Sequence, residues 1–150
     1  VPDDRRFRHL GIEPLGPGFD GDCMMRLAAG RRGPVKNFLM NGRLIVGVGN
    51  IYATEALFVA GIHPRRSVAR IGAARWNRLA ESVREVLAAA IEQGGTTLND
   101  FRDGHGGEGY FQVSLAAYGR EGEECTRCGR PIRRIVLGGR STFYCPGCQR

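Results

Sequence analysis

Hydrophobic and polar residues are spaced along this chain in a way that predicts mostly helix. The clearest case is residues 73–93, where apolar side chains recur every three to four positions and predict one buried helix face. These apolar positions are Leu79, Val83, Val86, Leu87, Ala90 and Ile91. The following pair of glycines predicts the end of the helix.

Three shorter helices are predicted before it, over residues 20–29, 34–40 and 50–60. Asp20 and Asn50 are the expected N-caps of the first and third, because their short polar side chains can accept from backbone N–H groups. A glycine or an Asn-Gly pair follows each range and predicts its end.

The remainder of the chain is less regular. Residues 94–109 are rich in glycine, and a long segment of this kind is either a functional loop or disordered. A short helical piece is predicted over residues 110–119. Two strand-like runs, PIRRIV and STFYC, then flank a predicted turn at residues 138–140, which indicates a β-hairpin. We therefore expect a mainly α fold of four helices followed by a small hairpin.

Composition and charge indicate a soluble protein with a polyanionic partner. Of the 150 residues, 42% are hydrophobic and 25% are charged, which is ordinary for a globular protein. No apolar run is long enough to cross a bilayer and no signal peptide opens the chain, so we expect a cytoplasmic protein without a membrane partner. The net charge of +7 points most simply to nucleic acid. Residues 125–150 contain six arginines and no carboxylate side chain.

The first residues are polar and rich in proline and glycine, which predicts a linker or domain edge over residues 1–19. The chain begins with Val1 rather than methionine. Methionine removal could explain this start, and a fragment of a longer protein explains it equally well.

Four of the five cysteines form two CxxC pairs whose spacing predicts a zinc site. The ligands would be Cys125, Cys128, Cys145 and Cys148. Two disulfides are the alternative, which a reducing cytosol disfavours. Because four thiolates fill a tetrahedral shell and leave no position for a catalytic water, we expect one structural zinc ion. The fifth residue, Cys23, is expected to be an inert core thiol.

The segment VGVGNIYATEAL, residues 46–57, places two glycines directly before a predicted helix. Gly47 and Gly49 would let a phosphate approach exposed backbone N–H groups, where the helix dipole favours an anion. Asn50 could add an amide donor, and contacts of this kind position DNA without reading its sequence. Two alternatives remain open: a structural asparagine cap after a tight turn, and a helix-hairpin-helix signature, GVGxxxA.

Several other residues are candidates for binding or for packing. Lys36 is the one lysine among 22 basic residues, and Arg31 and Arg32 precede it by about one helical turn, so the three could line one backbone track. Glu55 is expected to hold a neighbouring basic side chain, and Trp76 is expected to pack between helices. The three histidines have no partner at ligand or triad spacing.

Taken together, the motifs resemble the C-terminal half of a bacterial formamidopyrimidine-DNA glycosylase. The matching segments are VGVGNIYATEALFVAGIHP, IEQGGTTL, DG…GYF, YGR and CTRCGRPI…RSTFYCPGCQ. The resemblance runs from about residue 9 to residue 150. It implies a helix–two-turns–helix domain over residues 20–115 and the family's zinc finger over residues 116–150. Members excise oxidised purines such as 8-oxoguanine and formamidopyrimidines in base excision repair, and they cleave the abasic strand by β,δ-elimination.

The resemblance also implies particular contacts with damaged double-stranded DNA. Asn50 matches the family's phosphate-binding asparagine, Lys36 a backbone-contacting lysine and Arg32 a basic DNA-binding residue. Arg140 matches the finger arginine that contacts phosphates and takes part in the second elimination. Tyr110 is either a backbone contact or an anchor for the loop. Residues 94–109 correspond to the segment that closes over the everted base.

Two departures from the family limit what the resemblance implies. The family's nucleophile is an N-terminal proline amine followed by glutamate, on a domain that precedes this half. In this chain Val1 acylates Pro2, so we expect these 150 residues alone to be inactive and to need the catalytic domain as a partner. Asn99 stands where some members have lysine, which leaves the contacts to the damaged base open.

We therefore expect the DNA-binding half of a monomeric bacterial glycosylase and AP lyase. Two rival interpretations are an endonuclease VIII-like glycosylase and a non-enzymatic nucleic-acid-binding zinc module. GVGNIY and the TFYCPGCQ ending favour the purine enzyme over the first. The arginine of the zinc hairpin and the long glycine-rich loop argue against the second.

Overall fold

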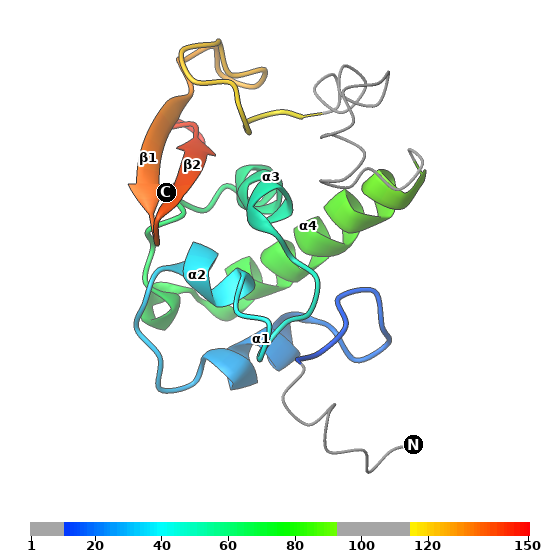
Figure 1. Ribbon diagram of the computed structural model, residues 1–150. Coiled ribbons are helices and arrows are strands. Elements are labelled where there is room, and N and C mark those ends of the chain that lie inside the picture. The colour runs from blue at the N-terminus through cyan, green and yellow to red at the C-terminus, as the bar shows by residue number, and fades with distance from the viewer. Residues whose placement is uncertain (1–10, 93–114) are drawn as a thin grey trace.

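The computed structural model describes residues 11–92 and 115–150. Its helices are α1 (Gly21–Ala28), α2 (Val35–Leu39), α3 (Asn50–Ala60) and α4 (Ala73–Glu92), with a 3-10 turn, η2, at Val68–Arg70. The strands β1 (Arg133–Leu137) and β2 (Arg140–Tyr144) form an antiparallel hairpin. Figure 1 shows the helices packed around α4, with the hairpin standing beside α3. The predicted mainly α fold with a terminal hairpin is confirmed.

Local sequence signals account for most helix ends. Asp20 caps α1, accepting a hydrogen bond from the Cys23 N–H at 2.8 Å. Gly61 ends α3 in the left-handed conformation, with φ of 74°, which a residue with a side chain rarely adopts. The apolar stripe predicted for α4 is buried at Leu79 and Val83 and packs against the core at Val86 and Leu87. The stripe does not continue to the end of the helix, because Ile91 is 61% exposed.

Three local predictions are wrong. Gly49 occupies the N-cap position of α3, and Asn50 is the first helical residue; its side chain makes no cap hydrogen bond because it is committed to the hairpin. Residues 115–119 form a bend and turns instead of helix, and residues 110–114 lie outside the described ranges. Arg140 begins β2, so only Gly138 and Gly139, both with positive φ, make the hairpin turn.

The buried side chains form two clusters. The larger one joins α1, α2, α3 and α4, and within it Trp76 packs edge-on against Phe38 with ring centroids 5.3 Å apart. The smaller one lies in the finger and also takes in Phe58 from α3. Trp76 is therefore a helix-packing residue, as predicted, and Cys23 is buried.

Residues 11–19 contact the helical domain. The Ile12 N–H donates to the Leu44 carbonyl at 2.9 Å, and Phe19 lies in the larger cluster. The domain boundaries drawn from the sequence, at residues 19/20 and 115/116, stay predictions. Within the described ranges, every helix is too short or too polar to cross a bilayer.

Candidate nucleic-acid interface and metal centre

A buried lysine joins α2, α3 and β2. Lys36 is only 1% exposed, and its ammonium donates to the Asn50 amide oxygen and, at 2.8 Å, to the Thr142 hydroxyl. The Asn50 amide nitrogen in turn donates to the Ser141 carbonyl at 3.0 Å. Two of these bonds reach across most of the sequence, from the helices to the hairpin. They fix the first turn of α3 against the strand that begins at Arg140.

The charge of this lysine is not balanced by a carboxylate within the described residues. Its two acceptors are neutral oxygens, and an ammonium can donate three hydrogen bonds. Burial, and then the positive charge of Arg140, lowers the pKa of Lys36 to about 8. Because both charges are positive and unpaired, an anion would be bound favourably beside them.

The N-terminus of α3 adds free backbone donors to this positive region. Within the described residues, the main-chain N–H groups of positions 47–51 donate no hydrogen bonds. Gly47 has φ of +82°, a backbone conformation that favours glycine, whereas Gly49 has φ of −84°, which any residue can adopt. A Cβ at either position would meet nothing within 4 Å, so the space outside them is open. A helix tip with unpaired N–H groups favours an anion.

Most of the DNA-binding residues predicted from the sequence line one cavity. Its volume is about 850 Å³, and Gly47, Gly49, Asn50 and Arg140 all contribute to its wall. The rest of the lining is mostly apolar, with Met40, Ile51 and Ile91 among its residues, and it includes one acidic residue, Glu13.

Other predicted residues are not gathered at this cavity. Lys36 does not line the cavity and reaches it only through Asn50. Arg32 lines a different hollow together with Arg31, so the single track predicted through Arg31, Arg32 and Lys36 is not formed by their side chains. Tyr110, Asn99 and the segment 94–109 lie outside the described residues.

The four CxxC cysteines converge on a metal-sized site. Their sulfur atoms all lie within 4.8 Å of one another, with Cys125–Cys148 at 3.8 Å and Cys128–Cys145 at 3.4 Å. A tetrahedral zinc with bonds of about 2.3 Å separates its sulfurs by about 3.8 Å, whereas a disulfide needs about 2.05 Å. The donor set therefore fits zinc and does not fit disulfides.

The closeness of the four sulfur atoms affects the ionisation of the cysteines. Without a metal, burial and the neighbouring sulfur atoms raise the pKa of the Cys148 thiol to about 12. Zinc would hold all four as thiolates and so join the two CxxC turns. It would act as a structural ion, because the protein supplies a complete ligand set.

The zinc finger is anchored on α3 by apolar and polar contacts. Phe58 packs with Ile132 and Phe143, and the Arg127 guanidinium lies over the Phe58 ring at 4.8 Å. Buried Gln149 donates to the Ile62 carbonyl at 3.0 Å and accepts from the backbone N–H of a zinc ligand. The hairpin therefore does not depend on its own apolar residues alone.

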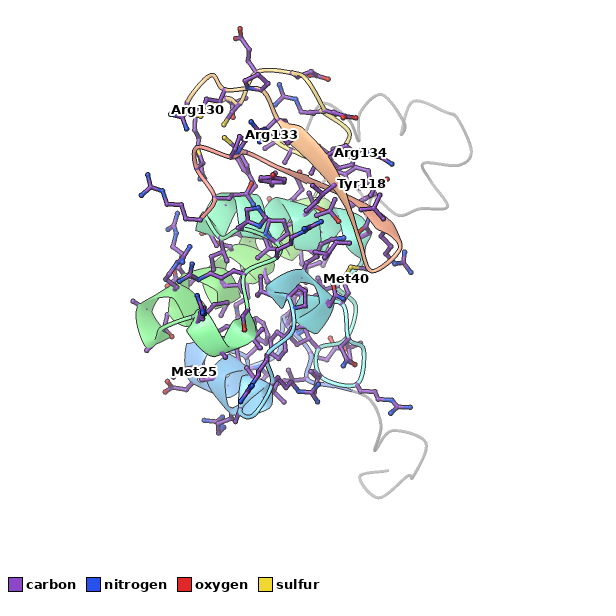
Figure 2. All side chains as sticks on the ribbon, turned by 90° about the vertical axis from the view of Figure 1, so that its left-hand side faces the viewer. Met25, Met40, Tyr118, Arg130, Arg133 and Arg134 are labelled. Carbon is purple, nitrogen blue, oxygen red and sulfur yellow. The ribbon has the colours of Figure 1, made fainter. Side chains whose placement is uncertain are left out.

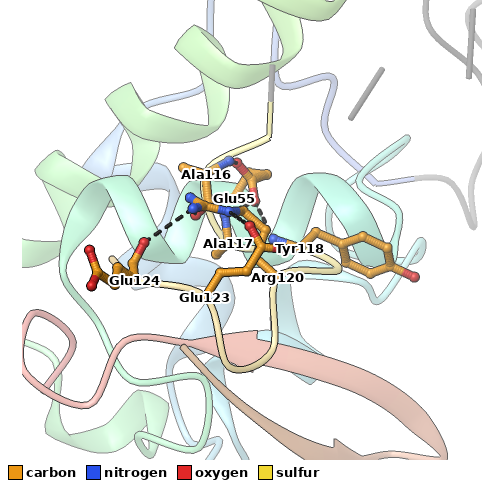
Figure 3. A network of polar contacts seen from close by, with 7 residues as sticks. All are labelled: Glu55, Ala116, Ala117, Tyr118, Arg120, Glu123 and Glu124. Atoms are coloured by element: carbon orange, nitrogen blue, oxygen red, sulfur yellow. Dashed lines mark hydrogen bonds and ion pairs between the residues drawn. The ribbon is translucent and has the colours of Figure 1, made fainter. Parts of the chain in front are cut away.

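Glu55 fixes the segment that enters the finger. Its carboxylate accepts three backbone N–H bonds, from Ala116 at 2.7 Å, Ala117 at 2.9 Å and Tyr118 at 2.8 Å (Figure 3). The prediction that Glu55 holds a basic side chain is wrong, because three backbone donors satisfy it. Arg120 bonds instead to the Ala116 carbonyl and to Glu123.

Sequence analysis missed one residue of this region, Thr142, and assigned the wrong partner to another, Glu55. Thr142 is fully buried, accepts from Lys36 and donates to the Arg140 carbonyl at 3.1 Å, so it connects the lysine to the arginine backbone. Nothing in the local pattern marks that threonine. The sequence does mark Glu55, which clamps the backbone of residues 116–118 through its three hydrogen bonds. It is the one charged residue in a largely apolar helical run, where an unpaired carboxylate would be costly.

The fold and the site together define a helical phosphate-binding domain joined to a zinc finger. Residues 10–102 match the family described as the formamidopyrimidine-DNA glycosylase H2TH domain. Residues 122–150 match the zinc finger found in FPG and IleRS. The chain belongs to the formamidopyrimidine-DNA glycosylase family.

Named relatives and solved structures support this family assignment. The chain is 55% identical over 143 residues to the formamidopyrimidine-DNA glycosylase of Acidithiobacillus ferrooxidans, covering 95% of this chain and 53% of that protein. It is 58% identical over 141 residues to that of Alkalilimnicola ehrlichii, covering 94% and 51%. The crystal structure of MutM (Fpg) from Thermus thermophilus superposes with a TM-score of 0.85 at 44% identity, covering 98% of this chain and 57% of that one.

A structure with bound DNA is also similar. The Lactococcus lactis Fpg in complex with DNA containing an abasic site gives a TM-score of 0.84 at 34% identity, with 95% of this chain and 52% of that chain covered. The chain spans about half the length of the curated relatives it matches.

Removal of zinc is expected to unfold the finger from about residue 121 onward, because binding at such a site is worth roughly 10–16 kcal/mol. DNA affinity should be lost with it, since Arg140, Ser141 and Thr142 lie on the finger. The fluorescence of Trp76, which sits in the helical core, should change little. Chelation followed by amide exchange and DNA titration measures both effects.

The control for this experiment is Cys23→Ser, which removes a thiol outside the metal site and should leave zinc content unchanged. Unaltered DNA binding after verified zinc loss would contradict a structural role for the metal.

Proposed function

We propose that this chain is the DNA-binding half of a formamidopyrimidine-DNA glycosylase and that it holds the sugar–phosphate backbone of damaged double-stranded DNA. The observation that carries the proposal is the unbalanced positive charge of Lys36 and Arg140 beside the free N–H groups of α3. A phosphodiester supplies the missing anion and accepts from those donors. The abasic-site DNA bound by the Lactococcus lactis relative supports this choice of ligand.

The parts of the site have distinct roles in this proposal. The N–H groups of positions 47–51 and the Asn50 amide position a phosphate. The exposed guanidinium of Arg140 binds a second phosphate and stabilises the charge that develops when the strand is cleaved. Arginine stays protonated at any accessible pH, so it acts there by electrostatics in preference to proton donation.

Lys36 acts indirectly in this scheme. At 1% exposure it is not a surface cation, and it contributes a fixed charge beneath the phosphate while holding Asn50 and Thr142 in place. The direct lysine–phosphate contact that the family resemblance implies stays a prediction.

The activity of the whole protein is proposed as excision of oxidised purines followed by β,δ-elimination at the abasic site. The names of the relatives favour this reaction over the endonuclease VIII alternative. The nucleophile would come from an N-terminal catalytic domain, as the family resemblance implies, since this chain spans about half the length of the curated relatives it matches.

Substitution of Arg140 by alanine should weaken DNA binding through the loss of one phosphate contact. The slope of log affinity against log salt should fall by about 0.9, the value for one released counterion. Titration of a duplex with a stable abasic-site analogue at several salt concentrations measures the slope. Arg26→Ser, an exposed arginine on α1, is the charge-matched control, and equal slopes for wild type and Arg140→Ala would remove Arg140 from the backbone contact.

DNA binding should be coupled to proton uptake by Lys36. The pKa of free Lys36 is about 8, so at pH 9 most of the protein carries the neutral amine. A bound phosphate favours the charged form and raises that pKa, so the complex should take up nearly one proton at pH 9 and much less at pH 7. Calorimetry in buffers of different ionisation enthalpy measures the uptake. Lys36→Met should abolish it; an unchanged uptake in that variant would assign the proton to another group.

Borohydride trapping tests whether the nucleophile lies on the proposed N-terminal domain and not on these 150 residues. On an 8-oxoguanine duplex, the 150-residue polypeptide should give no covalent adduct, because the proposed nucleophile lies on the N-terminal catalytic domain. A protein that also contains the proposed N-terminal domain should be trapped. An adduct on the 150-residue polypeptide would show that it contains a nucleophile of its own.

A further inference from the structure

A second hollow lies away from the cavity described above, between the loop that follows α3 and the C-terminal residues. Its volume is about 650 Å³, and it is lined by His63, Arg65, Arg66, Ser67, Arg70 and Arg150. We refer to these six residues as the arginine hollow. In Figure 1 the loop from α3 to α4 and the C-terminal end lie on the left, and Figure 2 faces that side.

No Asp or Glu side chain balances the charge of the arginine hollow in the described part of the chain. The sequence has no acidic residue between Glu55 and Glu81 and none from residue 125 to residue 150. The one ion pair found among the described residues, Arg120–Glu123, belongs to the finger entrance. Beside the hollow, burial and then the positive charge of Arg66 lower the pKa of Arg75. Four guanidinium groups therefore surround one space without an acidic side chain among them.

The backbone of the hollow is rigidly held. The loop is attached to α2 because the Val35 N–H donates to the Arg66 carbonyl at 2.8 Å, and the Lys36 N–H donates to the Pro64 carbonyl at 3.2 Å. Arg75 supports the opposite side, donating to the carbonyls of Gly61 at 2.9 Å and Arg150 at 2.8 Å. The arginines are thus brought together before any ligand binds.

The hollow is at the far end of the strand that begins at Arg140. The His63 ring packs against the Tyr144 ring with centroids 4.4 Å apart, and Tyr144 is the last residue of β2. Four residue steps of strand span about 13 Å. A duplex running along β2 would rise about 3.4 Å per base pair, so the two ends of the strand would lie about four base pairs apart along it. Figure 2 also shows Arg133 and Arg134 on the hairpin from this side.

We propose that the arginine hollow is a second phosphate-binding site, which engages the DNA backbone about four base pairs from the phosphates held by Arg140 and Asn50. The planar guanidinium fork suits phosphate oxygens, and several such groups around one space provide more than one contact. The inference rests on the proposed DNA binding and extends it from the lesion to the flanking duplex. The site adds affinity without reading sequence or damage.

The test removes two of the three exposed arginines of the hollow, Arg65, Arg70 and Arg150, whose side chains make no hydrogen bond within the described residues, in the variant Arg65→Ser/Arg70→Ser. Its salt slope on a long duplex with a stable abasic-site analogue should fall by about 1.8, or 0.9 for each lost contact. Two further duplexes carry neutral methylphosphonates in place of the phosphates roughly three to six base pairs from the lesion, each on a different side of it. On one of these two modified duplexes, wild type and variant should bind equally.

The controls separate this inference from the proposed function. Arg65→Lys/Arg70→Lys keeps the charge and should retain most of the wild-type slope, and Arg26→Ser gives the effect of losing one charge elsewhere. Zinc content and Trp76 fluorescence verify folding. If wild type binds the abasic duplex and the double variant shows the same slope, the arginine hollow is not a phosphate site, while the proposed function stands. If wild type does not bind at all, both are wrong.

Discussion

The hydrogen bonds of the buried Lys36 ammonium hold together the part of this structure that is proposed to bind DNA. Burying a cation is costly unless hydrogen bonds and an opposite charge compensate it. Asn50 and Thr142 supply acceptors for the hydrogen bonds of this ammonium. Within the described residues, no carboxylate balances its charge. The Lys36 side chain therefore joins the helices to the finger, and its positive charge remains unbalanced at that interface. In the proposed function, a DNA phosphate supplies this negative charge.

Helix α3 has a central place because both buried clusters use it. Its middle residues, 53–58, are buried on all sides, unlike those of α4, which present one face to the core. The first turn of α3 is directed to the proposed phosphate, Glu55 holds the entrance of the finger, and Phe58 lies in the finger cluster. Displacement of this one helix would disturb the helical core, the finger and the ligand site together.

Sequence reasoning predicted what local chemistry determines. The 3.6-residue stripe indicated α4, Asp20 indicated the cap of α1, and two CxxC turns indicated the metal ligands, because each signal lies within a few residues. The burial of Lys36, the three-amide clamp of Glu55 and the commitment of Asn50 to the hairpin could not be predicted in this way. Those contacts join residues 61 to 106 positions apart, and their identity depends on how α3 packs against the finger.

Attachment of the finger to α3 makes metal affinity a measure of helical integrity. Phe58, Glu55 and the Ile62 carbonyl form the docking surface only once α3 is folded against α4, so the preorganised sulfur cluster exists only in that state. By thermodynamic linkage, a substitution deep in the helical core, such as one at Leu79, would loosen zinc without touching a cysteine. Metal loss in a variant of this protein would then be a symptom of unfolding that began in the helices.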